Sequence, residues 1–344
     1  MKSVAVYLRI AMEKIVYKYY YYSFYLCNRV YHRIKNRKIK WLSLFLLLPV
    51  IVFKRFFGAT CDIICSIKVK RFKAHERNKD FDYNLAIVAI VKNEGAYIKE
   101  WLAYHKLIGV EKVFLYDNNS TDNLDIIVKP YIEEGFVKYE RFPGEGMQLK
   151  AYNDAINHYG KSVRYMAIID CDEFLVPKSG ELLPVINKLF QKYPCAGGIG
   201  ASWCVYGSSG KEKAEDGFVV ERFTKRGIKG DFPSVHYKTI INPRLVKEYV
   251  NPHFPIYKHG AYTVSPDGRR LYAMYNYDVC FDEIVCNHYF CKSKEEFIKK
   301  VSRGLADKPG VFRDMSIFDI YDKNDVEDTT MLKYIDGIKQ NIKY

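Results

Sequence analysis

Short apolar runs rich in β-branched residues alternate with helical patterns through the middle of this chain, and this alternation limits the folds it can adopt. Four such runs occur in order: LAIVAIV, KVFLYD, FVKYERF and RYMAIID. Helical spacing of apolar residues fills 97–108, 122–134 and 148–159, and a glycine follows each of these segments. Strands that alternate with helices predict an α/β fold, in which a mostly parallel, twisted sheet carries helices on both faces.

Polar clusters accompany the ends of three predicted strands. KNE occupies 92–94 after the first strand, DNNSTD occupies 117–122 at the end of the second, and DCDE occupies 170–173 at the end of the fourth. Ligands of open α/β sheets bind outside the carboxyl ends of the strands. We therefore expect the three clusters to converge on one crevice, although they are far apart in the sequence.

The third cluster contains two aspartates, Asp170 and Asp172, that flank a single residue. Alternation along an extended chain points both side chains to the same side. Adjacent carboxylates repel each other unless a cation joins them. Mg²⁺ or Mn²⁺ takes oxygen ligands and is often shared between protein carboxylates and substrate phosphates. Taken with the other two clusters, this D-x-D predicts a divalent metal site for a diphosphate, whereas D-x-D alone is also compatible with an acidic loop.

The pattern is less regular after Pro177. It predicts a helix over 181–193, a strand that enters a Gly/Ser loop over 197–210, and short antiparallel strands over 218–223 and 237–241. Ser293 and Glu296 have the spacing of a capping box, which predicts that a helix begins after Ser293.

Charge is distributed unevenly along the chain. Residues 1–73 hold 16 of the 54 Lys and Arg residues but only two of the 40 acidic residues, Glu13 and Asp62, which leaves 38 residues of each sign in the remainder. This asymmetry indicates a neutral globular body with a basic segment at one end. We expect a basic, aromatic, membrane-associating segment over 1–80, a globular α/β domain over 81–310, and a partly helical tail over 311–344.

The basic segment contains one apolar run, WLSLFLLLPVIVF, over 41–53. Its 13 residues are fewer than the roughly 20 that a membrane-spanning helix needs, and Pro49 disfavours a helix there. Basic flanks and aromatic residues favour a segment that lies on the surface of an anionic membrane. A true span and a helical hairpin packed on the protein are the alternatives.

Cysteine usage bears on the compartment. The nine cysteines are odd in number, form no C-x-x-C pair and in several cases lie inside apolar runs. This pattern predicts buried thiols in a reducing compartment. Together with the basic segment, it predicts a peripheral or monotopic protein on the cytoplasmic side of the cell membrane.

Several blocks of the sequence resemble glycosyltransferase family 92 and related family-2-like enzymes. The blocks are AIVKNEGAYIKEWLAYHKLIGVEKVFLYDNNSTD, YMAIIDCDEFLVP, SWCVYGSSG, ERF, HYKTIINP and NHYFCKSKEEFIKKVSRG, which span about 84–304 in order. The resemblance implies a GT-A fold of Rossmann-like type and a nucleotide-sugar donor, most often a uridine diphosphate (UDP) sugar. It also implies a divalent metal at the D-x-D and inversion at the anomeric carbon.

The resemblance also implies roles for residues that bind the nucleotide. Asp117 is expected to hydrogen-bond the uracil or the ribose, and Asn119 to shape its turn, although Asn119 has a purely structural alternative as a turn residue. Val91, Asn93 and Glu94 are expected to line the nucleotide pocket after the first strand. Gln148 and Asn153 are expected to face the same crevice, and Gln148 has the alternative of capping a helix.

A second group is implied to handle the metal and the diphosphate. Asp170 and Asp172 are expected to hold the metal or the ribose, and His288 to be a third ligand or a diphosphate contact. Taken alone, His288 is more typical of a buried histidine whose hydrogen bonds are satisfied within the core. Lys238 and Arg303 are expected to neutralise the leaving diphosphate, and the alternative for both is a solvated surface charge.

No motif marks the general base. The candidate carboxylates are Glu221, Asp231 and the pair Glu215 and Asp216. We favour Glu221 or Asp231, because the pair lies in a charged run, KEKAED, that is typical of a solvated loop. Trp203 and the loop 206–210 are expected to border the acceptor, since a flat aromatic ring suits the apolar face of a sugar. A core Trp is the alternative.

These observations predict a metal-dependent inverting glycosyltransferase that uses Mn²⁺ or Mg²⁺. Its partners would be a nucleotide-sugar donor and a glycan or lipid-linked acceptor, and surface polysaccharide synthesis is the expected process. Three rival classes remain: a non-catalytic scaffold of the same fold, a basic nucleic-acid-binding protein and a nucleotidyltransferase. The intact D-x-D opposes the first, the apolar run within the basic segment opposes the second, and KNEGAY is not the glycine- and basic-rich loop that the third requires. We therefore expect no nucleic-acid partner.

Overall fold

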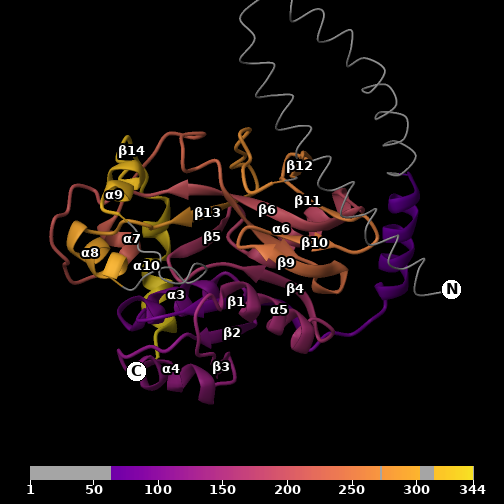
Figure 1. Cartoon of the computed structure of the whole chain (residues 1–344), viewed down its shortest axis with the longest axis horizontal. Helices are drawn as coiled ribbons and strands as arrows, with labels where there is room; N and C mark the ends of the chain where they lie inside the picture. Colours follow the sequence, from indigo (N-terminus) through magenta and orange to yellow (C-terminus); the bar gives the residue numbers. More distant parts are fainter. Residues whose placement is uncertain (1–62, 272, 303–313, 344) are drawn as a thin grey trace, which may run out of the picture. The chain divides into compact units, whose positions relative to one another are not determined.

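The structure is a computed structural model that describes residues 63–271, 273–302 and 314–343. The chain divides into two compact units, Met1–Ile67 and Lys68–Tyr344, and the second unit is described below (Figure 1). The apolar run at 41–53 lies outside the described residues. Within the described part, every helix is too short or too polar to cross a membrane.

The first half of the second unit contains strands and helices that alternate strictly. Strands β3, β2, β1 and β4 lie side by side in that order, and every neighbouring pair is parallel. The α/β prediction is therefore confirmed. The elements are β1 (Tyr83–Val91), α3 (Gly95–Leu107), β2 (Lys112–Asp117), α4 (Leu124–Glu133), β3 (Val137–Arg141), α5 (Gln148–Tyr159) and β4 (Val163–Ile168).

The second half extends this sheet with strands of mixed direction. Strand β8 lies between β4 and β6 and is antiparallel to both, while β13 pairs in parallel with β6 and antiparallel with β5. The elements as far as β10 are β5 (Glu173–Pro177), α6 (Leu182–Lys192), β6 (Ala196–Val205), α7 (Val219–Arg222), β7 (Lys225–Arg226), β8 (Tyr237–Ile241), η1 (Pro243–Leu245), β9 (Val246–Asn251) and β10 (Phe254–Tyr257). The rest are β11 (Tyr262–Val264), β12 (Arg270–Leu271), β13 (Ile284–His288), α8 (Lys294–Ser302), α9 (Ser316–Tyr321), β14 (Val326–Glu327), η2 (Thr330–Tyr334) and α10 (Ile335–Asn341).

One predicted strand is wrong. The segment predicted as a strand over 218–223 contains the short helix α7 (Val219–Arg222) instead, whereas the strand predicted over 237–241 is confirmed as β8. The backbone N–H groups of Val219 and Val220 donate to the carboxylate of Glu100, at 2.7 and 3.0 Å. A buried carboxylate that binds the free N–H groups of a helix start stabilises the helical conformation there. This partner is far away in the sequence, so the local pattern could not indicate it.

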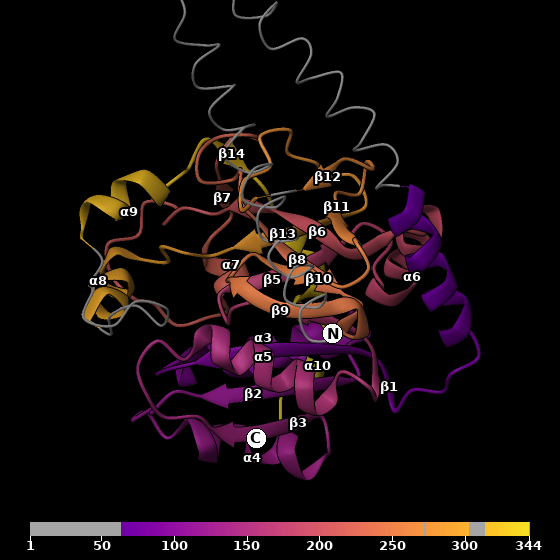
Figure 2. The same cartoon turned by 45° about the vertical axis from the view of Figure 1, so that its right-hand side comes forward.

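Each face of the sheet has its own apolar core. Alternate residues of β1, beginning with Leu85 and Ile87, pack against α3, α4, α6 and α10. The intervening residues, beginning with Ala86 and Val88, pack against α5 and β9. Helices therefore cover both faces, as predicted (Figures 1 and 2). The C-terminal helix α10 packs against α3 and belongs to the first of these cores.

Strand register decides where the polar clusters meet. Val91 pairs with Asp117, and Asp117 pairs with Arg141, so the ends of β1, β2 and β3 are level. Ile168 at the end of β4 pairs with Val88, which brings the following residues to the same edge.

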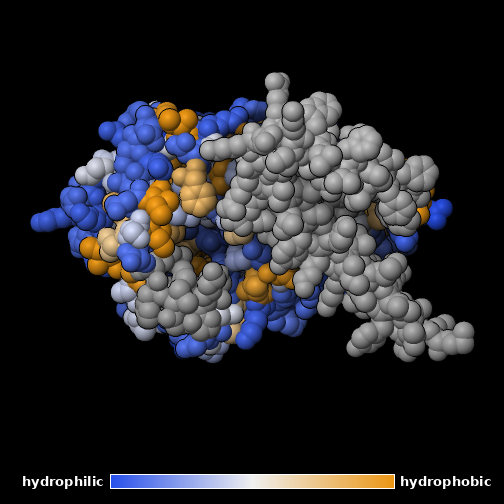
Figure 3. Space-filling model, turned by 45° about the horizontal axis from the view of Figure 1, so that its top comes forward, coloured by the Kyte–Doolittle hydropathy of each residue, from blue (hydrophilic) through white to orange (hydrophobic). Residues whose placement is uncertain are grey.

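The surface seen in Figure 3 is largely hydrophilic where described residues form it, with hydrophobic residues in small groups.

Candidate active site

The loops after β1 and β2 are bonded to each other at the edge of the sheet. The backbone N–H of Asn93 donates to Ser120 Oγ at 3.0 Å, and Asn93 Oδ1 accepts from the backbone N–H of Thr121 at 2.7 Å. Asn93 and Asn119 both have left-handed backbones, with φ of 54° and 60°, which asparagine tolerates better than most residues. The turn that was expected at Asn119 is therefore present, and its side chain is exposed.

Asp117 is buried at the end of β2, where it is only 4% exposed. Its Oδ1 accepts from the backbone N–H of Ser120 at 2.9 Å, and its Oδ2 accepts from the Tyr139 hydroxyl at 2.6 Å. These bonds fix the carboxylate before any ligand binds.

The start of α3 completes this side of the edge. Val91 lies in the apolar core, and Glu94 is buried immediately before α3. The backbone N–H of Gly95 donates to Asp122 Oδ2 at 2.7 Å. A Cβ at position 95 would lie 2.7 Å from Ile127 Cδ1 of α4 and 2.9 Å from Asp122 Oδ2, so the absence of a side chain here lets α3 approach α4 and the loop after β2 closely.

Asp170 lies at the centre of a cluster that draws on three elements. Its Oδ2 accepts from the Lys238 ammonium of β8 at 2.8 Å. Its Oδ1 accepts from Gln148 Nε2 and from the Tyr152 hydroxyl of α5, both at 3.1 Å. The Asp170 side chain remains 32% exposed. Gln148 therefore reaches the D-x-D directly through Asp170.

Lys238 is 1% exposed, so the alternative of a solvated surface charge is wrong. Burial by itself lowers the pKa of Lys238, but Asp170 and Glu173 outweigh burial and raise it well above the usual value. For Asp170, burial raises the pKa and Lys238 opposes it, with the result that the pKa is lowered. The two side chains therefore form a charged pair.

Glu173 is a buried acid that the sequence analysis did not include among the site residues. It is fully buried, its Oε2 accepts from the backbone N–H of Asp170 at 2.8 Å, and the same atom lies 3.5 Å from Lys238 Nζ. Burial raises the pKa of Glu173 well above its usual value despite Lys238, so the neutral acid is favoured. Its position as the last acid of DCDE was the only signal in the sequence.

Asp172 faces a different set of partners from Asp170. Asp172 Oδ1 lies 3.5 Å from His288 Nε2, and its Oδ2 accepts from the Lys300 ammonium of α8. The pairing of β13 with β5 sets His288 opposite Glu173 and thereby brings it to the D-x-D. Burial lowers the pKa of His288 and outweighs the attraction of Asp172, so the neutral imidazole is favoured.

The pair Asp172 and His288 has the chemistry of a divalent metal site. A carboxylate oxygen and the Nε2 of a neutral imidazole lie 3.5 Å apart there. The other ring nitrogen, Nδ1, points to a different side and is buried with no hydrogen-bond partner among the described residues. Asp170 is turned toward Lys238, and the described residues contain no group of three or more His, Cys, Asp or Glu side chains arranged around one ion. The residues present therefore fit a cation that takes its other ligands from a diphosphate and water.

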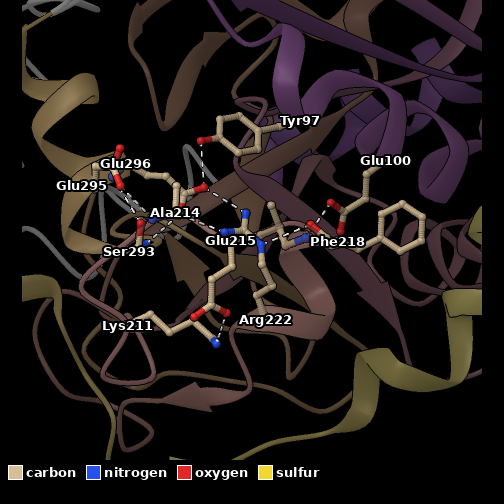
Figure 4. Close-up of polar contacts among 12 residues, drawn as sticks. Tyr97, Glu100, Lys211, Ala214, Glu215, Phe218, Arg222, Ser293, Glu295 and Glu296 are labelled. Carbon is tan, nitrogen blue, oxygen red and sulfur yellow. Dashed lines mark hydrogen bonds and ion pairs between the residues drawn. The ribbon is translucent and has the colours of Figure 1, made fainter.

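A buried polar network holds α7 and α8 against α3 (Figure 4). The Arg222 guanidinium donates two hydrogen bonds to the Glu296 carboxylate, at 2.9 and 3.0 Å, and the Tyr97 hydroxyl donates to the same carboxylate at 2.9 Å. Although burial opposes its ionisation, Arg222 and Ser293 lower the pKa of Glu296 to about 2. Lys300 lies on the same helix as Glu296, so this network positions Lys300 beside Asp172.

The other predicted residues lie in several places. Asn153 is bonded to the backbone N–H and carbonyl of Tyr249 in β9. The Glu221 carboxylate accepts from the backbone N–H of Phe218 at 3.2 Å and lies 4.0 Å from Lys339 Nζ. Asp231 is half-buried in the loop that precedes β8, and Arg303 lies outside the described residues.

Trp203 is 6% exposed, and Tyr206 in the loop after it is 1% exposed. The Trp203 ring packs on the rings of His288, His236 and His253, with centroid distances of 4.2, 4.8 and 5.2 Å. Neither Trp203 nor Tyr206 therefore presents a face to solvent, although Trp203 adjoins the D-x-D through His288.

The sequence model described as Glycosyltransferase family 92 matches residues 88–325. A glycosyltransferase family 92 protein of Oryza sativa subsp. japonica is 24% identical over 237 residues, which are 67% of this chain and 40% of that protein. Another, of Ricinus communis, is 26% identical over 234 residues, or 65% of this chain and 39% of that protein. The chain thus spans about two fifths of the length of these curated relatives.

Two solved structures show weak similarity. S. aureus TarS 1–349 in complex with UDP has a TM-score of 0.33 at 17% identity, over 47% of each chain. Glucosyl-3-phosphoglycerate synthase from Mycobacterium tuberculosis, in complex with Mn²⁺, UDP and glucosyl-3-phosphoglycerate, has a TM-score of 0.28 at 14% identity, over 52% of this chain and 62% of that one. The family match, in contrast, covers more than half of the chain, and so the chain belongs to glycosyltransferase family 92.

Proposed function

We propose that this protein is an inverting glycosyltransferase that moves a sugar from a UDP-sugar donor to a hydroxyl group of a glycan or lipid-linked acceptor. One observation carries the proposal. The strands that carry the site end at the same edge of the sheet. At this edge lie the buried carboxylate of Asp117, which is already hydrogen-bonded, and the pair formed by Asp172 and His288. Membership of family 92 supports the same reaction class.

The loops after β1 and β2 would bind the nucleoside. Asp117 is held by Ser120 and Tyr139 in a fixed orientation, so it costs little further ordering when a ribose or uracil hydrogen-bonds to it. Asn93 ties the two loops together and keeps this side of the crevice in one shape.

The D-x-D and its basic neighbours would bind the diphosphate. Asp172 and His288 would hold Mn²⁺ or Mg²⁺, which supplies Lewis-acid stabilisation of charge on the leaving group when bound. Lys238 neutralises Asp170 and fixes it next to Gln148 and Tyr152. Lys300 adds a further positive charge beside Asp172.

The acceptor hydroxyl attacks the anomeric carbon from the face opposite the diphosphate. A new carbon–oxygen bond forms, the bond to the diphosphate oxygen breaks, and the diphosphate leaves with the electron pair. A carboxylate takes the hydroxyl proton, which is help typically worth about 10²- to 10⁴-fold in rate. We assign this role to Asp231, because the carboxylate of Glu221 is already bonded to the start of α7 and lies near Lys339.

Nucleotide binding tests this function directly. We expect UDP with Mn²⁺ to raise the melting temperature of the protein, because a ligand that binds the folded state stabilises it. The stabilisation should be lost in Asp172→Asn, and Mn²⁺-dependent hydrolysis of a UDP-sugar should be lost with it. If neither UDP nor any other nucleoside diphosphate stabilises the wild-type protein, the proposed function is wrong and a non-catalytic scaffold is favoured.

The candidate base has its own test. Asp231→Asn should abolish transfer while UDP still stabilises the protein, whereas Glu221→Gln should retain most of the transfer activity. The reverse outcome would assign the proton transfer to Glu221.

We further propose that the basic segment attaches the protein to the cytoplasmic surface of an anionic membrane, where surface polysaccharide is made. The 16 Lys and Arg residues against two acids over 1–73 support this location. Co-sedimentation with vesicles of phosphatidylglycerol and phosphatidylcholine should be strong at low salt and weaken as salt rises. Equal binding to vesicles of phosphatidylcholine alone would contradict the electrostatic part of this proposal.

A further inference from the structure

We propose that an exposed row of aromatic side chains, formed by Phe232, Tyr275 and Tyr277, is a subsite that binds a sugar unit of the acceptor. This aromatic row adjoins the metal and diphosphate side of the crevice. The inference rests on the proposed function and narrows it: the acceptor bound at the active site is a carbohydrate, whether or not a lipid is attached further along it.

The exposure of these three side chains is unusual for this protein. Phe232 is 52% exposed, Tyr275 37% and Tyr277 76%. In the described part of the chain, these are the most exposed Phe, Tyr and Trp residues. Exposed aromatic rings gathered at one place indicate a binding surface rather than incidental exposure.

The aromatic row is continuous with the proposed active site. The ring centroids of Tyr277 and Tyr275 are 6.0 Å apart, and those of Tyr275 and His236 are 4.7 Å apart. The ring centroids of Phe232 and His236 are 5.6 Å apart. From His236 the rings continue to Trp203 at 4.8 Å, and from Trp203 to His288 at 4.2 Å. His288 is the residue that faces Asp172.

Two buried N–H donors along this path have no hydrogen-bond acceptor among the described residues. They are Trp203 Nε1 and Asn276 Nδ2, and each side chain belongs to a residue that is 6% exposed. Asn276 lies between Tyr275 and Tyr277, and its backbone N–H donates to the carbonyl of Val235 at 2.6 Å. Buried polar groups without a partner are rare in folded proteins, so these two point to a ligand that brings acceptors.

Carbohydrate matches both features. One face of a pyranose ring presents C–H groups that pack on aromatic rings, and its edge presents hydroxyl oxygens that accept hydrogen bonds. A hydrocarbon chain would cover the rings but leave the two N–H groups without acceptors. Asp231, the residue assigned above as the base, directly precedes Phe232 in the sequence. A sugar bound on the aromatic row would therefore place one of its hydroxyl groups near the Asp231 carboxylate.

Saturation-transfer NMR on the full-length protein tests the subsite without requiring turnover. The probes are methyl glycosides of five common pyranoses, mixed with the protein in the presence of UDP and Mn²⁺. We expect at least one of them to receive saturation, and we expect its affinity to fall about tenfold or more in Phe232→Ala and in Tyr275→Ala. Tyr275→Phe keeps the ring and should retain most of the affinity.

Ile126→Ala is the matched control, because Ile126 is a 67% exposed apolar residue of α4, away from this row in the sequence. It should leave sugar binding unchanged. UDP affinity should be the same in all four variants, since the aromatic row is not placed in the nucleotide site.

The outcomes separate this inference from the proposed function. If UDP binds but no glycoside receives saturation, or if the row variants bind the sugar as well as the wild type does, the subsite is wrong and the donor site stands. If UDP does not bind at all, the proposed function fails and the subsite fails with it. Loss of binding to phosphatidylglycerol vesicles in the row variants, without any sugar binding, would overturn the assignment in favour of a lipid surface.

Discussion

The two halves of the sheet build their shares of the active site by different means. In the parallel half, the bonds join neighbouring strands or the loops that follow them: Tyr139 to Asp117 spans 22 residues, and Asn93 to Ser120 spans 27. In the mixed half, the bonds join distant segments. Lys238 reaches Asp170 across 68 residues, Lys300 reaches Asp172 across 128, and Tyr97 reaches Glu296 across 199.

Under the proposed function, this difference separates nucleotide binding from catalysis in structural terms. Each bond in the parallel half closes a short β–α–β segment, so the nucleoside side of the crevice forms once two neighbouring strands pair. The diphosphate and acceptor side forms only when β8, β13 and α8 have all docked, which requires closing long loops. Perturbing the long-range bonds should therefore cost more than perturbing the local ones.

The largest expected effect is on the Lys238–Asp170 pair, which joins the two halves. Lys238→Met should lower the free energy of unfolding by about 3–5 kcal/mol, toward the lower end because Asp170 keeps some exposure. Removing the cation leaves the Asp170 carboxylate without its counter-charge. Chemical denaturation measures the change.

Lys188→Met is the control for that measurement, because Lys188 is 62% exposed in its ion pair with Glu283 and should contribute at most about 1 kcal/mol. If both lysine variants lose equally little stability, the buried pair does not join the halves as described.

The next effect concerns Glu100, which holds α7 to α3. Burial raises the pKa of Glu100 to about 7, against hydrogen bonds from Val220 and Val219 that lower it. A carboxyl group with a raised folded-state pKa contributes stability that is complete below its unfolded pKa of about 4.5, and this contribution is lost as the pH rises to about 7.

The difference in unfolding free energy between the wild type and Glu100→Gln should therefore shift against the wild type by up to about 3 kcal/mol between pH 4.5 and pH 7. Denaturation at a series of pH values gives this difference. If the difference in unfolding free energy stays constant over that range, the pKa of Glu100 is not raised in the folded protein.

A third experiment compares the two aspartates of the D-x-D. Asp172→Asn should lower the Mn²⁺-dependent affinity for UDP by about 10- to 100-fold, because Asp172 faces His288. Asp170→Asn should mainly reduce stability, because Asp170 is bonded to Lys238 and Gln148. Calorimetric titration of UDP with and without Mn²⁺ distinguishes them, and a larger loss of metal dependence in Asp170→Asn would reverse the assignment of the ligand.

The smallest effect is expected in the parallel half. Tyr139→Phe removes one hydrogen bond to Asp117, whose other oxygen keeps the backbone N–H of Ser120. The free energy of unfolding should fall by about 1 kcal/mol, with a modest loss of UDP affinity. A loss as large as that of Lys238→Met would remove the distinction between local and long-range bonds.

Much of the parallel half was predictable because its rules are local. Apolar runs in alternation with helical segments predicted the sheet, and the position of DNNSTD and DCDE after strands placed Asp117 and Asp170 at one edge.

One element outside the parallel half was also predictable from a local rule. The spacing of Ser293 and Glu296 predicted the start of α8, where the Glu296 carboxylate accepts from both the backbone N–H and the hydroxyl of Ser293.

The rest of the site depended on contacts that no local pattern encodes. Residues 218–223 have the composition of a strand but form α7, because Glu100 binds their backbone from another element. Trp203 was expected to border the acceptor, with a core Trp as the alternative, and it is buried, whereas Phe232, Tyr275 and Tyr277 are exposed. Lys238 could have been a surface charge until β8 was inserted between β4 and β6.

By itself, the sequence determined the alternation of strands and helices and the placing of its polar clusters at strand ends, because periodicity and strand direction are properties of short segments. Only the tertiary structure decided which cation neutralises which carboxylate and which aromatic rings face solvent. The partner and exposure of a side chain are set by elements that pack against it from tens to hundreds of residues away, and a one-dimensional pattern does not record that packing.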